Sequence, residues 1–184
     1  MKTATATATA TAVLVAALAA TASQASASEI RRFSYVATND EAQHRTQDIA
    51  LTVEQGLFGG MRVLHLYRSR GEDFDLKVNI PAWRPSALKA ALQGDPSGVH
   101  IYLVDPATGE GFARGACHGA RKAWLAMVKP EPYEPLVIAV LADDPAAHAP
   151  VVCERLEYRW QGEWVLPGGR NDSRKDSGQA QTKF

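Results

Sequence analysis

The chain has 184 residues, of which 46% are hydrophobic, and its 20 basic side chains balance its 20 acidic ones. This charge balance excludes a protein that binds nucleic acid through a strongly basic surface. The length fits one ordinary domain with a sizeable core.

Residues 1–27 have the pattern of a secretory signal peptide. Lys2 gives a basic start, residues 12–20 are apolar, and Ala25-Ser26-Ala27 provides the small residues that signal peptidase requires. The alternative is an uncleaved membrane anchor, but the apolar segment is shorter than the roughly 20 residues that span a bilayer. We therefore expect cleavage after Ala27, no stable membrane insertion afterwards, and a periplasmic or secreted protein.

Alternating apolar and polar residues predict a mature chain made mostly of strands. The alternation is clearest over 74–80, which carries four apolar side chains on one face and three polar ones on the other. The segments 48–54 and 61–68 are joined by a glycine-containing loop and predict a hairpin. The expected strands, in chain order, cover residues 30–37, 48–54, 61–68, 74–80, 99–104, 112–117, 120–128, 136–142 and 151–160, with a short addition at 163–166.

One short helix is expected, over residues 85–92. Pro85 suits the first helical position, the Ala and Leu content favours helix, and Gly94 can terminate it. The polar residues 39–47 are expected to form a loop, and Asp105 to Gly109 a turn.

These elements predict a single mainly β domain over residues 28–166. An antiparallel two-layer sandwich and a curved sheet that holds the helix against one face both fit, with an α+β arrangement as the alternative. The segment 136–142 is apolar on both faces, so we place it centrally and covered on both sides. Residues 167–184 are almost wholly polar and are expected to be disordered.

The two cysteines, Cys117 and Cys153, are expected to form a disulfide, because export places the chain in an oxidising compartment. Closing this loop contributes roughly 3–4 kcal/mol in the chain-entropy model. The alternation over 151–160 puts Cys153 on a polar face, so the bridge is expected at the rim or the outer face of the sheet rather than in the deepest core. The alternative is a free thiol at Cys117 activated by His118, but adjacent strand residues point to opposite faces.

Motifs for catalysis or metal binding are missing from the sequence. It has no G-x-S-x-G, no H-E-x-x-H, no Cys-His zinc spacing and no phosphate-binding loop. We therefore assign no catalytic residue, metal site or cofactor. Asp143, Asp144 and His148 can hold a divalent cation in principle, although Asp-Asp-Pro is an ordinary turn. His65 and His100 are expected to be partly buried and hydrogen-bonded.

Aromatic residues provide the remaining candidates. Trp83 with Arg84, and Trp164, form a candidate binding surface, because tryptophan beside arginine can stack on sugar rings or hold a partner protein. Tyr158 and Trp160 share a face with Leu156 in the alternation and are expected in the core.

Two functions follow from this sequence. The first is an exported, non-enzymatic domain that binds a protein or a cell-envelope component, and the missing catalytic motifs favour it. The alternative is a small periplasmic hydrolase or metal-dependent enzyme whose site is assembled from distant residues, such as His118 or the Asp143 segment.

Overall fold

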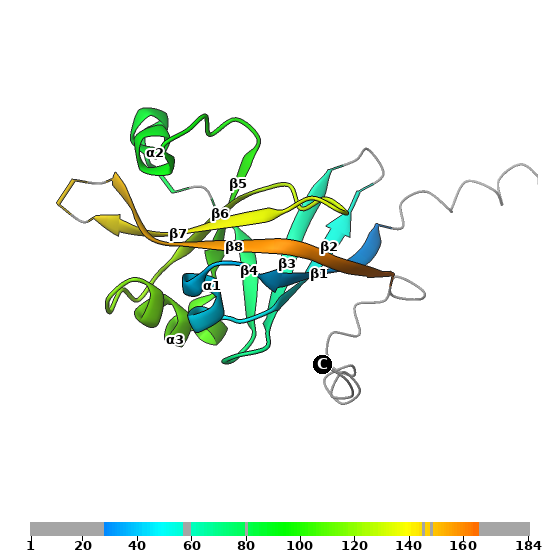
Figure 1. Ribbon diagram of the computed structural model, residues 1–184. Helices are drawn as coiled ribbons and strands as arrows, with labels where there is room; N and C mark the ends of the chain where they lie inside the picture. Colours follow the sequence, from blue (N-terminus) through cyan, green and yellow to red (C-terminus); the bar gives the residue numbers. More distant parts are fainter. Residues whose placement is uncertain (1–27, 57–59, 80, 145, 148, 166–184) are drawn as a thin grey trace, which may run out of the picture.

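A computed structural model describes residues 28–56, 60–79, 81–144, 146–147 and 149–165 (Figure 1). The predicted signal peptide and the predicted tail from 167 onward lie outside the described residues. In chain order the elements are β1 (Glu29–Ala37), α1 (Asp40–Arg45), β2 (Ile49–Gln55), β3 (Met61–Arg68), β4 (Phe74–Val78), α2 (Pro85–Leu92), β5 (Val99–Val104), α3 (Pro106–Ala116), β6 (Trp124–Val128), β7 (Leu136–Asp144) and β8 (Ala149–Val165).

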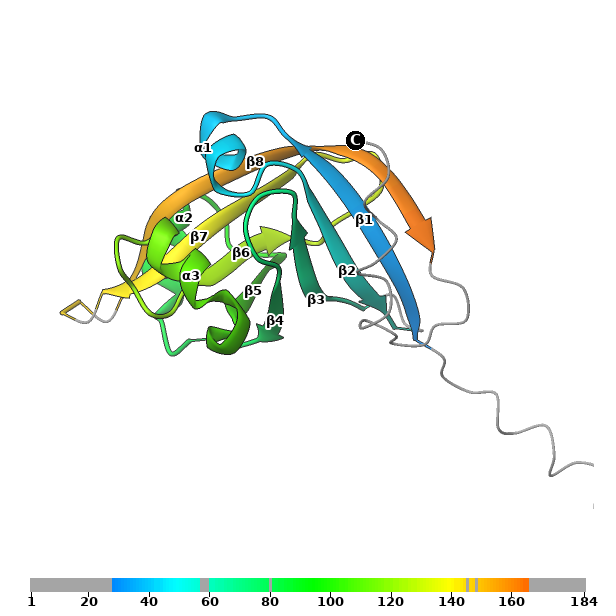
Figure 2. The same ribbon diagram turned by 90° about the horizontal axis from the view of Figure 1, so that it is seen from below.

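The eight strands form a closed antiparallel barrel, so the predicted sandwich or curved open sheet is wrong. Each strand pairs with the next one along the chain, and β8 also pairs with β1, where Tyr35 lies opposite Trp160. Figure 2 shows β1 and β8 side by side. Alternation in the sequence indicates which residues of a strand face the core. It does not indicate whether the first and last strands of the sheet pair and close it into a barrel.

Strand β8 makes the closure possible because it is long and bends twice. Its 17 residues run without a break through the position where two separate strands had been predicted. The register shifts opposite Val140 and Leu141 leave Cys153 in a bulge, and a second shift opposite Ser34 and Tyr35 leaves Gln161 in another. Bulges bend a strand and change which face its side chains take. The alternation that had been read across Cys153 therefore breaks at that residue.

Side chains fill the barrel interior. All eight strands contribute inward residues with little or no exposure, including three tyrosines. An eight-stranded barrel is just wide enough for its own side chains to fill. The inward residues are Phe33, Tyr35, Leu51, Val53, Val63, Leu66, Phe74, Leu76, Tyr102, Val104, Leu125, Met127, Ile138, Val140, Leu156 and Tyr158.

Two of the three described helices were missed in the sequence. Helix α1 occupies the predicted loop, and the Asn39 side chain caps it by accepting a hydrogen bond from the Ala42 amide at 3.1 Å. Helix α3 replaces both the predicted turn at Asp105 and the predicted strand over 112–117. The Asp105 side chain caps it and Pro106 begins it, so residues typical of a turn start a helix here.

Glycine lets α3 approach the barrel closely. A Cβ added at Gly109 would lie 2.2 Å from Cγ1 of Val104 and 3.2 Å from Cβ of Phe74. Glycine has a low helix propensity. Gly109 is nevertheless part of α3, because any larger residue would collide with Val104 at this close approach.

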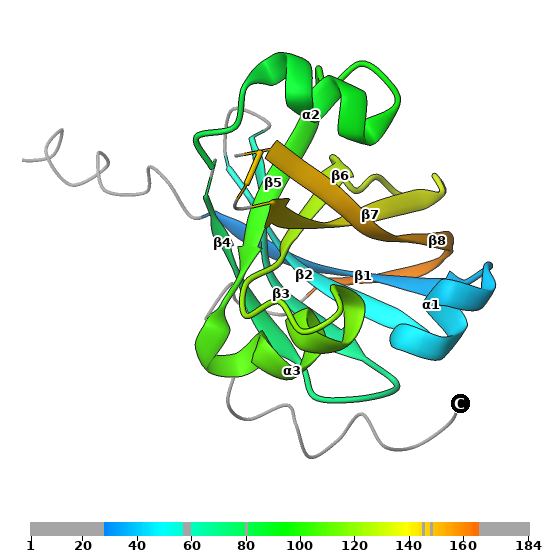
Figure 3. The same cartoon turned by 90° about the vertical axis from the view of Figure 1, so that its left-hand side faces the viewer.

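The predicted helix α2 is confirmed with its bounds, and it covers part of the outer surface of the barrel. A second apolar cluster lies beneath it on the outer faces of β5, β6 and β7. The predicted cover on both sides is confirmed for Ala139 and Leu141 of β7, whereas Val137 is 38% exposed. Figure 3 shows α2 on the opposite side of the barrel from α1 and α3. None of the described helices is long and apolar enough to cross a membrane. The cluster contains Ile101, Trp124, Ala126, Ala139 and Leu141, with Trp83, Leu88 and Leu92 packed against it.

The predicted disulfide between Cys117 and Cys153 is present, and the free-thiol alternative is therefore wrong. It joins the residue after α3 to the first bulge of β8, at the end of the barrel that carries α1 and α3. Cys117 is buried and Cys153 is half-buried.

Removing the bridge should destabilise the protein. We expect the Cys117→Ser/Cys153→Ser double variant to lose about 3–4 kcal/mol of unfolding free energy, since the bridge spans a sequence separation of 36. Urea unfolding followed by tryptophan fluorescence measures this difference. The wild type in reductant serves as the control and should unfold with the double variant. Equal midpoints for the oxidised wild type and the double variant would contradict the prediction.

Candidate functional site

Side chains of the described residues fill the barrel interior, and a cavity lies at one end of the barrel. At the end that carries α1 and α3, the structure has a half-open cavity of about 280 Å³. Helix α1, the loop between β3 and β4, and α3 surround it, and Figure 3 views the barrel from this side. The residues that line it are Arg45, Arg68, Gly71, Glu72, Thr108, Gly111 and Phe112.

Arg68, the last residue of β3, forms one wall of the cavity. Its Nε and Nη2 both donate to the backbone carbonyl of Glu72, the former at 2.6 Å. Its Cζ lies 5.2 Å from the ring centre of Phe74 and 5.3 Å from that of Phe112. Burial lowers the pKa of Arg68, and the nearby charge of Arg45 adds to this effect. The Phe74 and Phe112 ring centres are themselves only 4.8 Å apart, so the guanidinium lies over both rings on one side and is partly desolvated.

Arg45, the last residue of α1, forms the facing wall. Its Nε donates to Glu154 at 2.9 Å, and its Nη2 donates to the other oxygen of the same carboxylate. This paired geometry raises the pKa of Arg45. On the α3 side, a Cβ added at Gly115 would lie 2.6 Å from Nη1 of Arg45, so glycine leaves room for the guanidinium.

Both arginines leave Nη1 out of their intramolecular hydrogen bonds, and Nη1 of Arg45 lies against Gly115 of α3. Each uses Nε and Nη2 for its intramolecular hydrogen bonds, and no described residue accepts a hydrogen bond from Nη1 of either. Thr108 adds a hydroxyl that accepts from the Asp75 amide at 3.1 Å and keeps its own proton to donate. The cavity wall therefore offers hydrogen-bond donors from three different segments of the chain.

A buried hydrogen bond fixes the base of this end of the barrel. The hydroxyls of Thr46 and Tyr158 lie 2.7 Å apart, and both residues are almost fully buried. Burial raises the pKa of Tyr158, so the phenol stays neutral. Because Thr46 directly follows Arg45 and Tyr158 lies in β8, this bond holds the end of α1 against the barrel.

The charge of the cavity lining is small and positive. Arg45 and Arg68 contribute two positive charges, and Glu72 contributes one negative charge. Glu154 lies just outside the lining and pairs with the Arg45 guanidinium, whereas Asp73 accepts a hydrogen bond from the backbone amide of Arg68. Because Glu154 already pairs with Arg45, little positive charge is left in the cavity for a ligand group with two negative charges.

The predicted binding residues Trp83, Arg84 and Trp164 are not brought together. The Trp83 ring packs edge-on against Trp124 at 5.1 Å, and its Nε1 donates to Asp143 at 2.9 Å. Arg84 is exposed at the start of α2. Trp164 lies opposite Arg32 near the end of β8, whereas Asp143 pairs at the start of β8. Whether Trp83 and Arg84 bind a ligand stays a prediction.

The histidine and aspartate candidates are also separated. His118 is exposed with a positive φ of 50°, beside a cysteine that is already bonded. Asp144 accepts hydrogen bonds from the amides of residues 146 and 147, which is the turn role, and His148 lies outside the described residues. Among the described residues no group of three or more His, Cys, Asp or Glu is arranged to hold a metal ion.

His65 and His100 differ in their surroundings. His65 lies in β3 and its Nδ1 is 2.7 Å from Asp75, so the predicted hydrogen bond is confirmed. His100 is exposed near the start of β5, and the prediction that it is partly buried is wrong.

Comparisons with protein-family models, with curated proteins and with solved structures find no match to this chain. The cavity residues had no signal in the sequence, because Arg45, Arg68 and Thr108 belong to no motif and are brought together only by the barrel pairing.

Gly71 should prove essential for the position of Arg68. It has a φ of +94°, and a Cβ there would lie 2.9 Å from Cζ of Arg68. We expect Gly71→Ala to displace the guanidinium and to lose about 1 kcal/mol more unfolding free energy than the control. The control is Gly119→Ala, which has the same φ and no atom within 4 Å of the added Cβ. Urea titration of both variants measures the difference, and equal losses would show that Gly71 serves only the backbone.

Proposed function

We propose that this protein is an exported, non-enzymatic binding protein whose cavity between α1 and α3 holds a carboxylate group of its ligand. The observation that carries the proposal is the pair of fixed arginines, each with Nη1 unengaged by any described residue, in a cavity of about 280 Å³. Export rests on the pattern of residues 1–27 and is compatible with the Cys117–Cys153 disulfide.

The chemistry of the lining supports a monoanion. Planar guanidinium groups pair well with planar carboxylates. Arg45 is already paired with Glu154, so a group with one negative charge suits the lining better than a group with two. Phe112 and the glycine backbone add apolar surface for the carbon skeleton of an organic acid.

The lining favours binding over catalysis. The lining contains neither histidine nor cysteine. Its arginines stay protonated near neutral pH and therefore cannot act as a general acid or base. The remaining groups, Thr108 and Glu72, lack a neighbouring base or acid partner within the lining. A proton-transfer reaction would need groups that the cavity does not supply.

The size of the cavity restricts what can enter it. Ligand pockets usually measure about 300–1,000 Å³, so a cavity of about 280 Å³ admits a small organic acid or only the terminal group of a larger molecule. A free acid and the C-terminal carboxylate of a peptide share this chemistry. A peptide C-terminus as the bound group would fit the expectation, made from the sequence, that the ligand is a protein or an envelope component.

Calorimetric titration with benzoate and with the peptide Ala-Ala-Ala tests the site. Benzamide and the amidated peptide are the neutral controls. We expect the acid forms to bind and Arg68→Gln to weaken binding at least about tenfold, because one charge-assisted contact is worth about 1.4 kcal/mol or more. Arg68→Lys, which keeps the charge without the planar fork, should retain part of the affinity.

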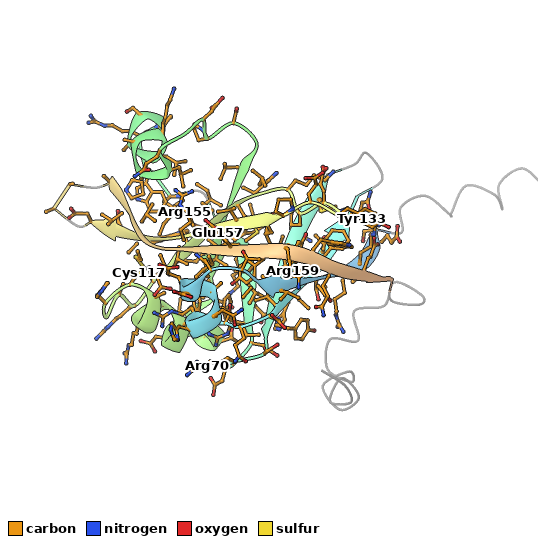
Figure 4. All side chains as sticks on the ribbon, in the orientation of Figure 1. Arg70, Cys117, Tyr133, Arg155, Glu157 and Arg159 are labelled. Atoms are coloured by element: carbon orange, nitrogen blue, oxygen red, sulfur yellow. A yellow bond between two sulfur atoms is a disulfide. The ribbon has the colours of Figure 1, made fainter. Side chains whose placement is uncertain are left out.

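Arg70→Gln is the matched control, since Arg70 is exposed in the same loop and outside the cavity lining (Figure 4). It removes the same charge and should leave binding unchanged. Thermal unfolding of each variant separates lost binding from lost structure. Equal binding of benzoate and benzamide, or equal effects of Arg68→Gln and Arg70→Gln, would refute the carboxylate site.

A further inference from the structure

The opposite end of the barrel carries exposed aromatic surface. The loop that joins β6 to β7 presents Tyr133, which is 85% exposed. Figure 4 shows Tyr133 at the far side of the barrel from Arg70 and Cys117. Val78 and Val128, the last residues of β4 and β6, are also exposed at this end, at 60% and 49%. Most of the large exposed apolar side chains of the described chain are therefore gathered around one opening.

Tyr133 is held in place although its side chain is in solvent. Its backbone has a φ of +67°, a conformation that residues other than glycine rarely take. Two hydrogen bonds to the Glu131 carbonyl hold the loop. The Glu134 amide donates to it at 3.4 Å, and the Tyr35 hydroxyl donates to it at 3.5 Å. A strained and fixed exposed tyrosine indicates a surface that is shaped for contact.

Trp160 continues the aromatic surface beneath Tyr133. Its ring centre lies 5.8 Å from that of Tyr133, and it is only half-buried. Phe33 and Tyr35 meet it edge-on at 5.4 and 5.5 Å and fix its orientation. Tyr133 and Trp160 together form an aromatic platform at the rim of the barrel, with their rings tilted by 53° to each other.

Planar polar side chains lie next to this platform. Arg31 lies over the Phe33 ring at 5.2 Å, and Phe33 contacts Trp160. Arg31 donates from Nη1 to the Gln55 amide oxygen at 2.8 Å and from Nε to the Glu163 carboxylate. The Gln55 amide nitrogen donates no hydrogen bond to a described residue, and the second Glu163 oxygen accepts none from one. They can therefore serve a ligand as one donor and one acceptor.

We propose that this rim is a second binding site and that it takes a pyranose ring of a glycan. A sugar ring has an apolar C–H face that stacks on an aromatic ring and hydroxyl groups at its edge that need paired donors and acceptors. The platform supplies the aromatic face, and Arg31, Gln55 and Glu163 supply the planar polar groups. The site is independent of the carboxylate cavity, since the two lie at opposite ends of a filled barrel.

Saturation-transfer NMR with cellotetraose, tetra-N-acetylchitotetraose and maltotetraose tests this site directly. Irradiation of aromatic protons should transfer saturation to the sugar C–H protons of at least one tetrasaccharide. We expect Tyr133→Ala to weaken its binding about fivefold to tenfold, by loss of one stacked ring. Tyr133→Phe keeps the ring and should bind like the wild type.

Two controls separate this site from the cavity and from folding defects. Val151→Ala removes an exposed apolar side chain at the start of β8, away from the platform, and should leave binding unchanged. Arg68→Gln should also bind sugar normally, so that failure of one proposed site is distinguishable from failure of the other. Absence of saturation transfer with all three sugars, or equal binding by wild type and Tyr133→Ala, overturns the proposal. A change of sedimentation coefficient in Tyr133→Ala without sugar binding would instead identify a contact between copies.

Discussion

The tight packing inside the barrel is the constraint on which the rest of the structure depends. Eight strands enclose only enough space for their own side chains, and Phe33, Phe74 and Leu125 are among those with no exposure. In the described part of the chain these side chains fill the interior and provide the hydrophobic stabilisation. The polar groups of the candidate sites therefore lie near the ends of the strands. Tyr158 and Tyr35 mark these limits, because each places its ring in the core and its hydroxyl near a loop or helix.

The same contacts hold the fold together and prepare the candidate sites. Arg68 fastens its own loop through the Glu72 carbonyl, and the same bonds set the direction of its remaining nitrogen. Arg45 joins α1 to β8 through Glu154 in the same way. At the other end Trp160 packs on Phe33 while part of its surface stays accessible. Ligand groups would thus meet side chains that have already lost their rotational freedom, which reduces the entropic cost of binding.

The sequence predicts local structure here better than it predicts closure. The strands at 61–68 and 99–104 and the helix at 85–92 were predicted with their observed bounds, because apolar periodicity and Pro85 act within a few residues. The barrel was missed because the pairing of β1 with β8 depends on two bulges, and a bulge at Cys153 has no compositional mark. The carboxylate cavity was missed for a related reason, since its arginines become neighbours only after the strands have paired.

The pairing of the first strand with the last has a consequence for how the chain folds. Neighbouring strands can form hairpins early, but the β1–β8 contacts join residues more than a hundred positions apart, as in the pair Arg31 and Val165. Such a high contact order slows folding, because a very long loop must close before its contacts are gained. Until β8 is in place, β1 and β7 each present an open edge to any other chain nearby. The Cys117–Cys153 bridge attaches β8 to the preceding helix, so oxidation shortens the search for the final strand and with it the time during which the protein can aggregate.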